Sequence, residues 1–214
     1  MEALAKRIAA SIGKNLGKTD EQIAVITYGL IGILQFLAIL IISLTIGFIF
    51  GTWAEVLVIF FSVGFLRRLT GGAHSRGIYN CLVYSVCFVC GFSWISAYLL
   101  VRAPISYVIL PACLAIYIFG YVTVFLKAPV TPPNKPCRTE AKRRRLRRGA
   151  FIVLTVFLAI NTALILFGIS HERLLRIGLA LALSVLWQIF MMTRPGHIVI
   201  SVIDGAFLHK RDKA

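Results

Sequence analysis

Acidic side chains are scarce in this sequence, and charge of either sign is uncommon. Eight Asp and Glu stand against twenty-three Lys and Arg, and charged residues make up only 14% of the 214 positions. Hydrophobic residues make up 59%, and the mean hydropathy of +0.87 lies far above that of a soluble globular domain. The composition excludes an ordinary soluble enzyme and predicts an all-α, polytopic membrane protein.

Disulfide frameworks and metal clusters have little support either. The five cysteines form an odd number without the spacing of a secreted scaffold. Cys87 and Cys90 form a Cys-x-x-Cys motif, but it lies in an apolar run without further ligands, so we expect no metal and no other cofactor. The N-terminus lacks the short apolar run of a cleavable signal peptide, and none is expected.

The first twenty residues have the periodicity of a surface helix. An apolar residue recurs every four positions, at Leu4, Ile8, Ile12 and Leu16, and the basic residues lie largely off this stripe. We predict an amphipathic interfacial helix over residues 1–20, its basic face toward anionic lipid headgroups. A charged lead-in without membrane contact is the alternative.

Long apolar runs occupy most of the remaining chain. About 20 apolar residues suffice to cross the hydrocarbon of a bilayer. Within a single membrane domain, residues 1–214, we predict six transmembrane helices at 23–48, 52–66, 77–101, 103–126, 149–170 and 177–193. The second run is short and contains Glu55, so it either begins before Glu55 or lies at the bilayer edge.

The basic residues are distributed unevenly between the two sides of this topology. With the N-terminus in the cytoplasm, twenty basic residues lie on the cytoplasmic side and three, Arg102, Arg173 and Arg176, on the other. The positive-inside rule then places both termini, residues 67–81 and the loop 127–148 in the cytoplasm. We therefore expect a multi-pass protein of the cell membrane in this orientation.

A histidine and a cysteine stand out in the polar, glycine-bearing stretch 67–81. His74 precedes Cys81 by seven residues. An imidazole that takes the proton of a thiol activates it as a nucleophile, so this stretch is a candidate catalytic site. On a continuous helix the two residues would lie about 10 Å apart along the axis, too far for a hydrogen bond.

A Cys-His pair therefore requires a bend between its two members. Gly71, Gly72 and Gly77 give the backbone the freedom to turn, because glycine adopts positive φ without a Cβ clash. We predict that a loop with His74 folds back on a helix that begins near Gly77. Cys81 would then lie in the first turns of that helix, where the helix dipole favours a thiolate.

The loop 127–148 holds nine Lys and Arg in twenty-two residues, more than orientation alone requires. We infer that it attracts an acidic ligand, either lipid headgroups or an acidic peptide segment. Nucleic acid is not expected, because no aromatic residue lies among these charges.

Two other functional classes are weighed against an enzyme. A small transporter or exporter would have ionisable residues within its spans and an internal repeat. The spans hold almost none, and no repeat is evident. A structural membrane partner without catalysis predicts that Cys81→Ala and His74→Ala both leave function intact.

Several motifs together resemble the accessory gene regulator B (AgrB) family. The family's Arg-x4-Gly-x-His-x6-Cys core is matched by Arg67, Gly72, His74 and Cys81. The turn Ala128-Pro129…Asn134-Lys135-Pro136 precedes a polybasic run, and six crossings are predicted. The resemblance covers essentially the whole chain.

The resemblance implies a bacterial membrane cysteine endopeptidase that acts in quorum sensing. Its substrate would be a membrane-bound precursor of an autoinducing peptide, with an amphipathic leader, a central cysteine and an acidic C-terminal tail. The enzyme removes the tail through a thioester, and the substrate's cysteine then forms a thiolactone. The resemblance also implies a homodimer.

Individual residues can be given roles on this basis. Cys81 is the nucleophile and His74 its base, with Arg67 and Gly72 as supporting residues. The substrate tail would bind the basic loop, for which we name Lys135, Arg143, Arg144 and Arg145. The group that orients His74 stays open among Ser75, Asn80, Gln35 and Glu55.

Overall fold

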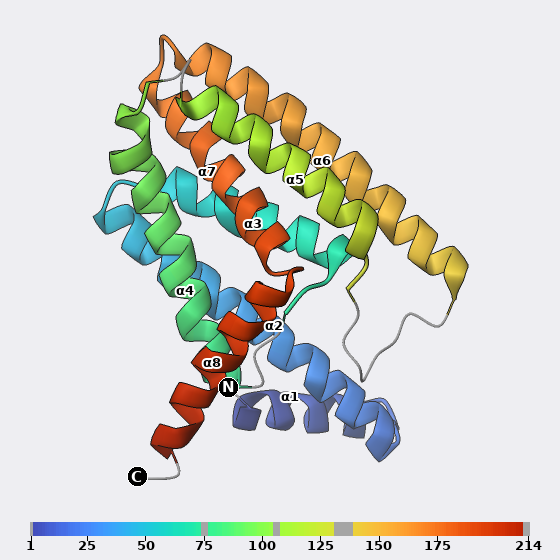
Figure 1. Ribbon diagram of the computed structural model, residues 1–214. Coiled ribbons are helices and arrows are strands. Elements are labelled where there is room, and N and C mark those ends of the chain that lie inside the picture. Colours follow the sequence, from blue (N-terminus) through green and yellow to red (C-terminus); the bar gives the residue numbers. More distant parts are fainter. Residues whose placement is uncertain (1, 74–76, 105–107, 131–138, 212–214) are drawn as a thin grey trace.

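The computed structural model describes residues 2–73, 77–104, 108–130 and 139–211, with side chains as far as residue 205. These residues form α1 (Glu2–Asn15), α2 (Asp20–Ile49), α3 (Trp53–Thr70), α4 (Ile78–Trp94), η1 (Ile95–Leu99), η2 (Leu100–Arg102), α5 (Leu110–Lys127), α6 (Glu140–Gly168), α7 (Glu172–Phe190) and α8 (Arg194–Arg211). The predicted all-α class is confirmed (Figure 1).

Five of the described helical segments are long and apolar enough to cross a membrane. They are α2, the continuous segment Ile78–Arg102, α5, α6 and α7. The protein is therefore a multi-pass membrane protein. The expected crossing at 52–66 corresponds to α3, which is not among the five because its eighteen residues include Glu55, Arg67 and Arg68.

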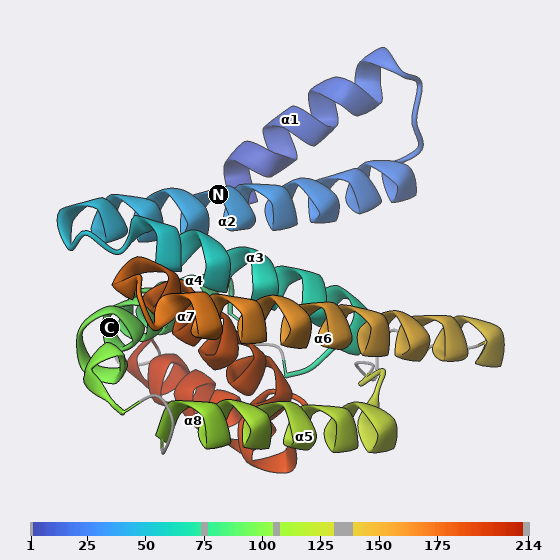
Figure 2. The same ribbon diagram turned by 90° about the horizontal axis from the view of Figure 1, so that it is seen from above.

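Helix α3 lies at the centre of the bundle, between α2 and the pair α6 and α7 (Figure 2). Its residues Val56 and Ile59 are fully buried and pack with Val89 of α4 and Ala180 of α7. A helix that neighbours enclose can retain charges at its ends, since those charges need not face hydrocarbon.

Hydrogen bonds between segments gather the helix ends into two groups. The backbone N–H of Val130 donates to the Thr70 carbonyl at 2.8 Å, which joins the end of α3 to the end of α5. Arg147 Nε donates to the Ala128 carbonyl at 3.0 Å, so the first turns of α6 lie at the same end. At the opposite end the Arg176 guanidinium donates to the Gly51 carbonyl at 3.1 Å.

Two boundaries differ from the sequence expectations. The crossing expected at 103–126 begins with Ala103 in extended backbone angles ahead of Pro104, because a residue before proline disfavours the α conformation. Val108 and Ile109 are π-helical, and α5 begins at Leu110. Residues 140–148 of the expected loop are instead the first turns of α6. Lys and Arg are good helix formers, and no proline lies between Thr139 and Gly168.

The two terminal helices lie outside the set of five. In α1 the small residues Ala5, Ala9 and Gly13 are buried, and α1 packs against α2. The apolar stripe at Leu4, Ile8, Ile12 and Leu16 is left exposed. Helix α8, which the sequence analysis treats only as a tail, contacts α4.

Candidate active site

Cys81 lies in the first turn of α4, as the sequence predicts. Gly77 is the N-cap residue, and the Cys81 backbone N–H donates to its carbonyl at 2.9 Å. The thiol is partly exposed, and Sγ contacts the Tyr84 hydroxyl at 3.6 Å. A thiolate at this position gains from the partial positive charge of the helix N-terminus.

The backbone ahead of the histidine depends on two glycines. Gly71 has φ 71° and Gly72 has φ 137°, in the region that favours glycine. Gly71 forms a parallel β-bridge with Val130, and a Cβ at Gly71 would collide with the Val130 carbonyl oxygen. At Gly72 an added Cβ would lie 3.3 Å from the Met191 carbonyl oxygen. Both positions therefore combine an unusual φ with a close approach of another segment.

Four hydrogen bonds fix the same segment to the rest of the bundle. Gln188 Nε2 donates to Thr70 Oγ1 at 2.8 Å and to the Gly71 carbonyl at 2.7 Å. The Ala73 backbone N–H donates to the Met191 carbonyl at 3.0 Å. Arg67 donates through its guanidinium to the Ala73 carbonyl. Contacts from α3 and from the end of α7 thus hold residues 70–73, the segment directly ahead of position 74.

The proposed base and one residue of the proposed tail-binding set lie outside the described residues. His74 and Lys135 belong to the ranges 74–76 and 131–138. The pairing of His74 with Cys81 therefore stays a prediction. The structure does describe the residues on both sides, Ala73 and Gly77, and Cys81 itself.

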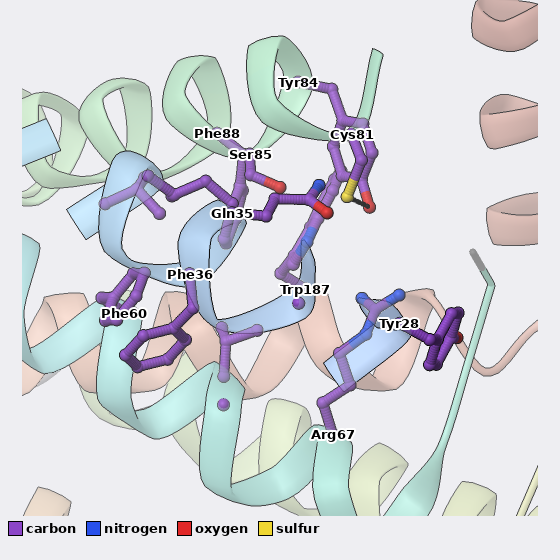
Figure 3. A pocket seen from close by; sticks show the side chains of 15 residues that line it. Tyr28, Gln35, Phe36, Phe60, Arg67, Cys81, Tyr84, Ser85, Phe88 and Trp187 are labelled. Atoms are coloured by element: carbon purple, nitrogen blue, oxygen red, sulfur yellow. Dashed lines mark hydrogen bonds between the residues drawn. The ribbon is translucent and has the colours of Figure 1, made fainter. Parts of the chain in front are cut away.

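A pocket of about 390 Å³ opens beside Cys81 (Figure 3). The labelled side chains come from α2 (Tyr28, Gln35, Phe36), α3 (Phe60, Arg67), α4 (Cys81, Tyr84, Ser85, Phe88) and α7 (Trp187). Cys81 and Arg67 therefore line one cavity, although they are fourteen positions apart in the sequence.

The structure distinguishes among the residues that could orient His74. Gln35 lines the pocket and donates through Nε2 to the Ile78 carbonyl at 3.3 Å. Glu55 is buried and pairs through Oε1 with Arg176 Nε at 2.8 Å. It lies twelve residues before Arg67 on α3, about 18 Å along the helix axis, so Glu55 does not belong to the pocket. Ser75 lies outside the described residues.

A carboxylate that the sequence analysis missed lies beside the remaining candidate. Asn80 Nδ2 donates to Asp204 Oδ1 at 3.2 Å, and Asp204 is only 6% exposed. Asp204 belongs to α8, so only the packing of the tail against α4 brings it next to the residue that precedes Cys81. The available signal was an acidic residue in an apolar stretch, because acidic side chains are rarely buried without a partner.

The basic residues near the start of α6 line a separate groove of about 760 Å³. Its basic members are Lys142, Arg144, Arg145 and Arg148, and Leu69 of α3 lies on its other side. Arg143 is exposed but does not line the groove. The only acidic partner that the structure gives these described basic residues is Glu140, 3.7 Å from Arg144 in a highly exposed pair. Such a pair contributes little and leaves the groove basic.

Comparison with known proteins agrees with these motifs. A family model described as accessory gene regulator B matches residues 5–192. An AgrB-like protein of Clostridium perfringens strain SM101 is 30% identical over 212 residues, which is 96% of this chain and 97% of the relative. Protein FsrB of Enterococcus faecalis strain OG1RF is 27% identical over 162 residues, 74% of this chain and 64% of that protein. No solved structure matches the chain. With the family model covering most of its length, the chain belongs to the accessory gene regulator B family.

Proposed function

We propose that this protein is a membrane cysteine endopeptidase that removes the acidic tail of a quorum-sensing precursor and promotes its cyclisation. The family processes precursors of autoinducing peptides. The observation that carries the proposal is the position of Cys81, in the first turn of α4 and on the wall of a pocket that Arg67 also lines. A nucleophile on an open cavity can reach a peptide carbonyl.

The first chemical step is acyl transfer to Cys81. His74 takes the thiol proton, and Sγ attacks the carbonyl carbon of the scissile peptide bond. The C–N bond breaks as His74 returns that proton to the leaving amine, and the acidic tail departs with a new N-terminus. The product is a thioester between Cys81 and the carboxyl end of the remaining precursor.

The second step is thioester exchange within the substrate. The precursor's own cysteine thiol attacks the same carbonyl carbon, and Cys81 leaves as a thiolate that recovers the proton of the attacking thiol. One thioester replaces another, so the step needs no large free-energy change if water is kept from the intermediate. The aromatic lining of the pocket beside Cys81 supports such exclusion.

Arg67 and Gly72 serve this chemistry through the backbone. The Arg67 contact to the Ala73 carbonyl and the positive φ of Gly72 both act on the residues directly ahead of His74. We propose that they set the direction from which the imidazole approaches Cys81.

The two groups of helix ends support one orientation in the membrane. If α3 crosses the membrane in addition to the five apolar segments, the chain has six crossings. The ends of α3 and α5 and the start of α6 then face the cytoplasm together with both termini. The basic residues near these ends, from Arg67 to Arg148, support this side, whereas Arg102, Arg173 and Arg176 mark the other. Anionic lipids would meet the basic side, and the family leads us to propose a homodimer.

The basic groove is the proposed docking site for the acidic tail. Arg144 and Arg145 line it directly, and Arg143 adds attraction at longer range. Lys135, which lies outside the described residues, is the fourth residue that we name for this role. We expect Arg144→Gln with Arg145→Gln to raise KM for the precursor, with kcat little changed, and Arg143→Gln to have a smaller effect. Unchanged KM at low salt, where screening is weakest, would contradict the docking role.

Tail release is the direct test of the function. The full chain is co-expressed with a precursor that carries an amphipathic leader, a central cysteine and an acidic end, and the released tail is detected by mass spectrometry. Cys81→Ser should abolish release, whereas Cys87→Ser, a change on the exposed face of the same helix, should not. Release at the full rate by Cys81→Ser, with normal membrane insertion, would refute the peptidase and favour a non-catalytic membrane partner.

A further inference from the structure

The pocket beside Cys81 has a polar end and an aromatic end. Arg67 and Cys81 lie near the adjoining ends of α3 and α4, and Phe60 and Phe88 lie about two turns deeper on the same helices. A group that reaches the thiol from the polar end therefore has an aromatic chamber beyond it.

Two aromatic pairs form the walls of this chamber. Phe36 of α2 and Phe60 of α3 have ring centroids 4.6 Å apart. Phe88 of α4 stacks on Trp187 of α7 at 4.3 Å with an interplanar angle of 15°. Figure 3 shows Phe36 and Phe60 close together on one side of the cavity. Apart from Arg67 at the polar end, the described residues that line this pocket are uncharged, and most of them are aromatic or aliphatic. Its chemistry suits an uncharged, bulky apolar group and disfavours a carboxylate-rich one.

The positions of the two cavities indicate which part of a precursor fits this chamber. Arg67 lines the pocket and Leu69 lines the basic groove, and residues two apart on a helix point to different faces. The acidic tail is drawn to the groove, so the part of the substrate on the acyl side of the scissile bond is left for the pocket. This step rests on the proposed function.

We infer that the pocket is a specificity site for the residue whose carbonyl Cys81 attacks, and that it selects a bulky apolar side chain there. Gly32 of α2 and Gly64 of α3 set its size. Both line the cavity, and a Cβ added at either would have no atom within 4 Å. A side chain introduced at either position would therefore start from a Cβ that meets no neighbour, on the wall of the cavity.

The inference can be tested with reagents that need no precursor. N-acetyl-leucine chloromethyl ketone and N-acetyl-alanine chloromethyl ketone each form a C–S bond with the Cys81 thiolate and release chloride, and they differ only in the side chain. Iodoacetamide, which has no such side chain, measures the intrinsic reactivity of the thiol. The full-length protein in detergent is labelled with each reagent, and modification of Cys81 is followed by peptide mass spectrometry.

The leucine reagent should label wild-type Cys81 at least about tenfold faster than the alanine reagent, because each methylene in an apolar pocket is worth a factor of about 10 to 200. Gly64→Leu and Gly32→Leu should remove this preference and leave the iodoacetamide rate unchanged. Gly91→Leu is the matched control, since Gly91 also has free space around an added Cβ but does not line the pocket, and its preference should equal that of the wild type.

The specificity site and the proposed function would be refuted by different results. Equal wild-type rates for the two chloromethyl ketones, or a preference that survives both Gly32→Leu and Gly64→Leu, would overturn the specificity site and leave the pocket to a lipid chain. A preference that behaves as expected, in a protein that never cleaves a precursor, would support the site and refute the proposed function instead.

Discussion

Replacement of Gln188 tests whether α7 holds the segment that leads to the histidine. The Gln188 side chain is 1% exposed and gives its amide hydrogens to Thr70 Oγ1 and the Gly71 carbonyl. Leucine has a similar size but donates nothing. The Thr70 hydroxyl already donates to the Leu66 carbonyl at 2.8 Å, so the Gly71 carbonyl would lose its best donor.

The size of the effect follows from these contacts. An unsatisfied buried carbonyl costs about 1–3 kcal/mol, and the lost bond to Thr70 about 1 kcal/mol. Gln188 Oε1 is buried and has no hydrogen-bond partner in the described structure, so its removal returns part of this cost. A net loss of about 1–2 kcal/mol corresponds to a factor of roughly 5 to 30 in the local opening equilibrium.

Hydrogen exchange in detergent measures this opening. Gln188→Leu should increase exchange at the Ala73 amide by that factor and lower kcat for the precursor more than it raises KM. Asn161→Leu is the matched control, because Asn161 is equally buried and donates to the Gly178 carbonyl at 2.6 Å, away from Cys81. Unchanged exchange and cleavage in Gln188→Leu, or equal effects in Asn161→Leu, would refute the positioning role.

Three further changes test the framework around the site. Glu55→Gln should destabilise the protein by about 1–3 kcal/mol because it removes the charge partner of Arg176, whose side chain is only partly buried. The double change Glu55→Leu with Arg176→Leu should cost less. Thermal unfolding in detergent measures both changes, and additive costs would contradict a coupled pair. Gly71→Ala should lower the free energy of unfolding by more than about 2 kcal/mol, since the positive φ of Gly71 and the Val130 carbonyl both oppose a Cβ. Gly64→Ala should be nearly neutral or stabilising. Equal unfolding midpoints for the two variants would show that the bridge to Val130 does not form. Asp204→Ala should slow precursor cleavage, because it removes the acceptor of the Asn80 side chain beside Cys81. Rescue by Asp204→Asn, which keeps an acceptor, would show that hydrogen bonding rather than charge matters. Full activity in both variants would exclude Asp204 from the site.

The local features of the site were predictable because they depend on local sequence. Gly77 marks the start of α4 and thereby places Cys81 in its first turn, and the glycines at 71 and 72 take the positive φ values that a bend requires. The sequence does not predict the start of α6, because the high charge of residues 140–148 places them in the basic loop, although their intrinsic preference is helical.

The long-range contacts were not predictable from one sequence. Gln188 lies 117 positions from Gly71, and Asp204 lies 124 positions from Asn80. Each appears in the sequence as a single polar residue in an apolar stretch, which suggests a buried partner but not its identity. Glu55 is the converse case, since only the packing of the helices reveals its partner Arg176 and removes Glu55 from the candidates for orienting His74.

A covalent adduct on Cys81 would test the central claim most directly. Purified protein is mixed with precursor, quenched in acid and measured by intact mass spectrometry, with the modified residue located by peptide mapping. The account predicts a mass increase equal to the precursor without its tail, located on Cys81, removed by hydroxylamine, absent in Cys81→Ser and retained in Cys87→Ser. Release of the tail at the wild-type rate without any adduct on Cys81, or an adduct that persists on another cysteine in Cys81→Ser, would contradict it.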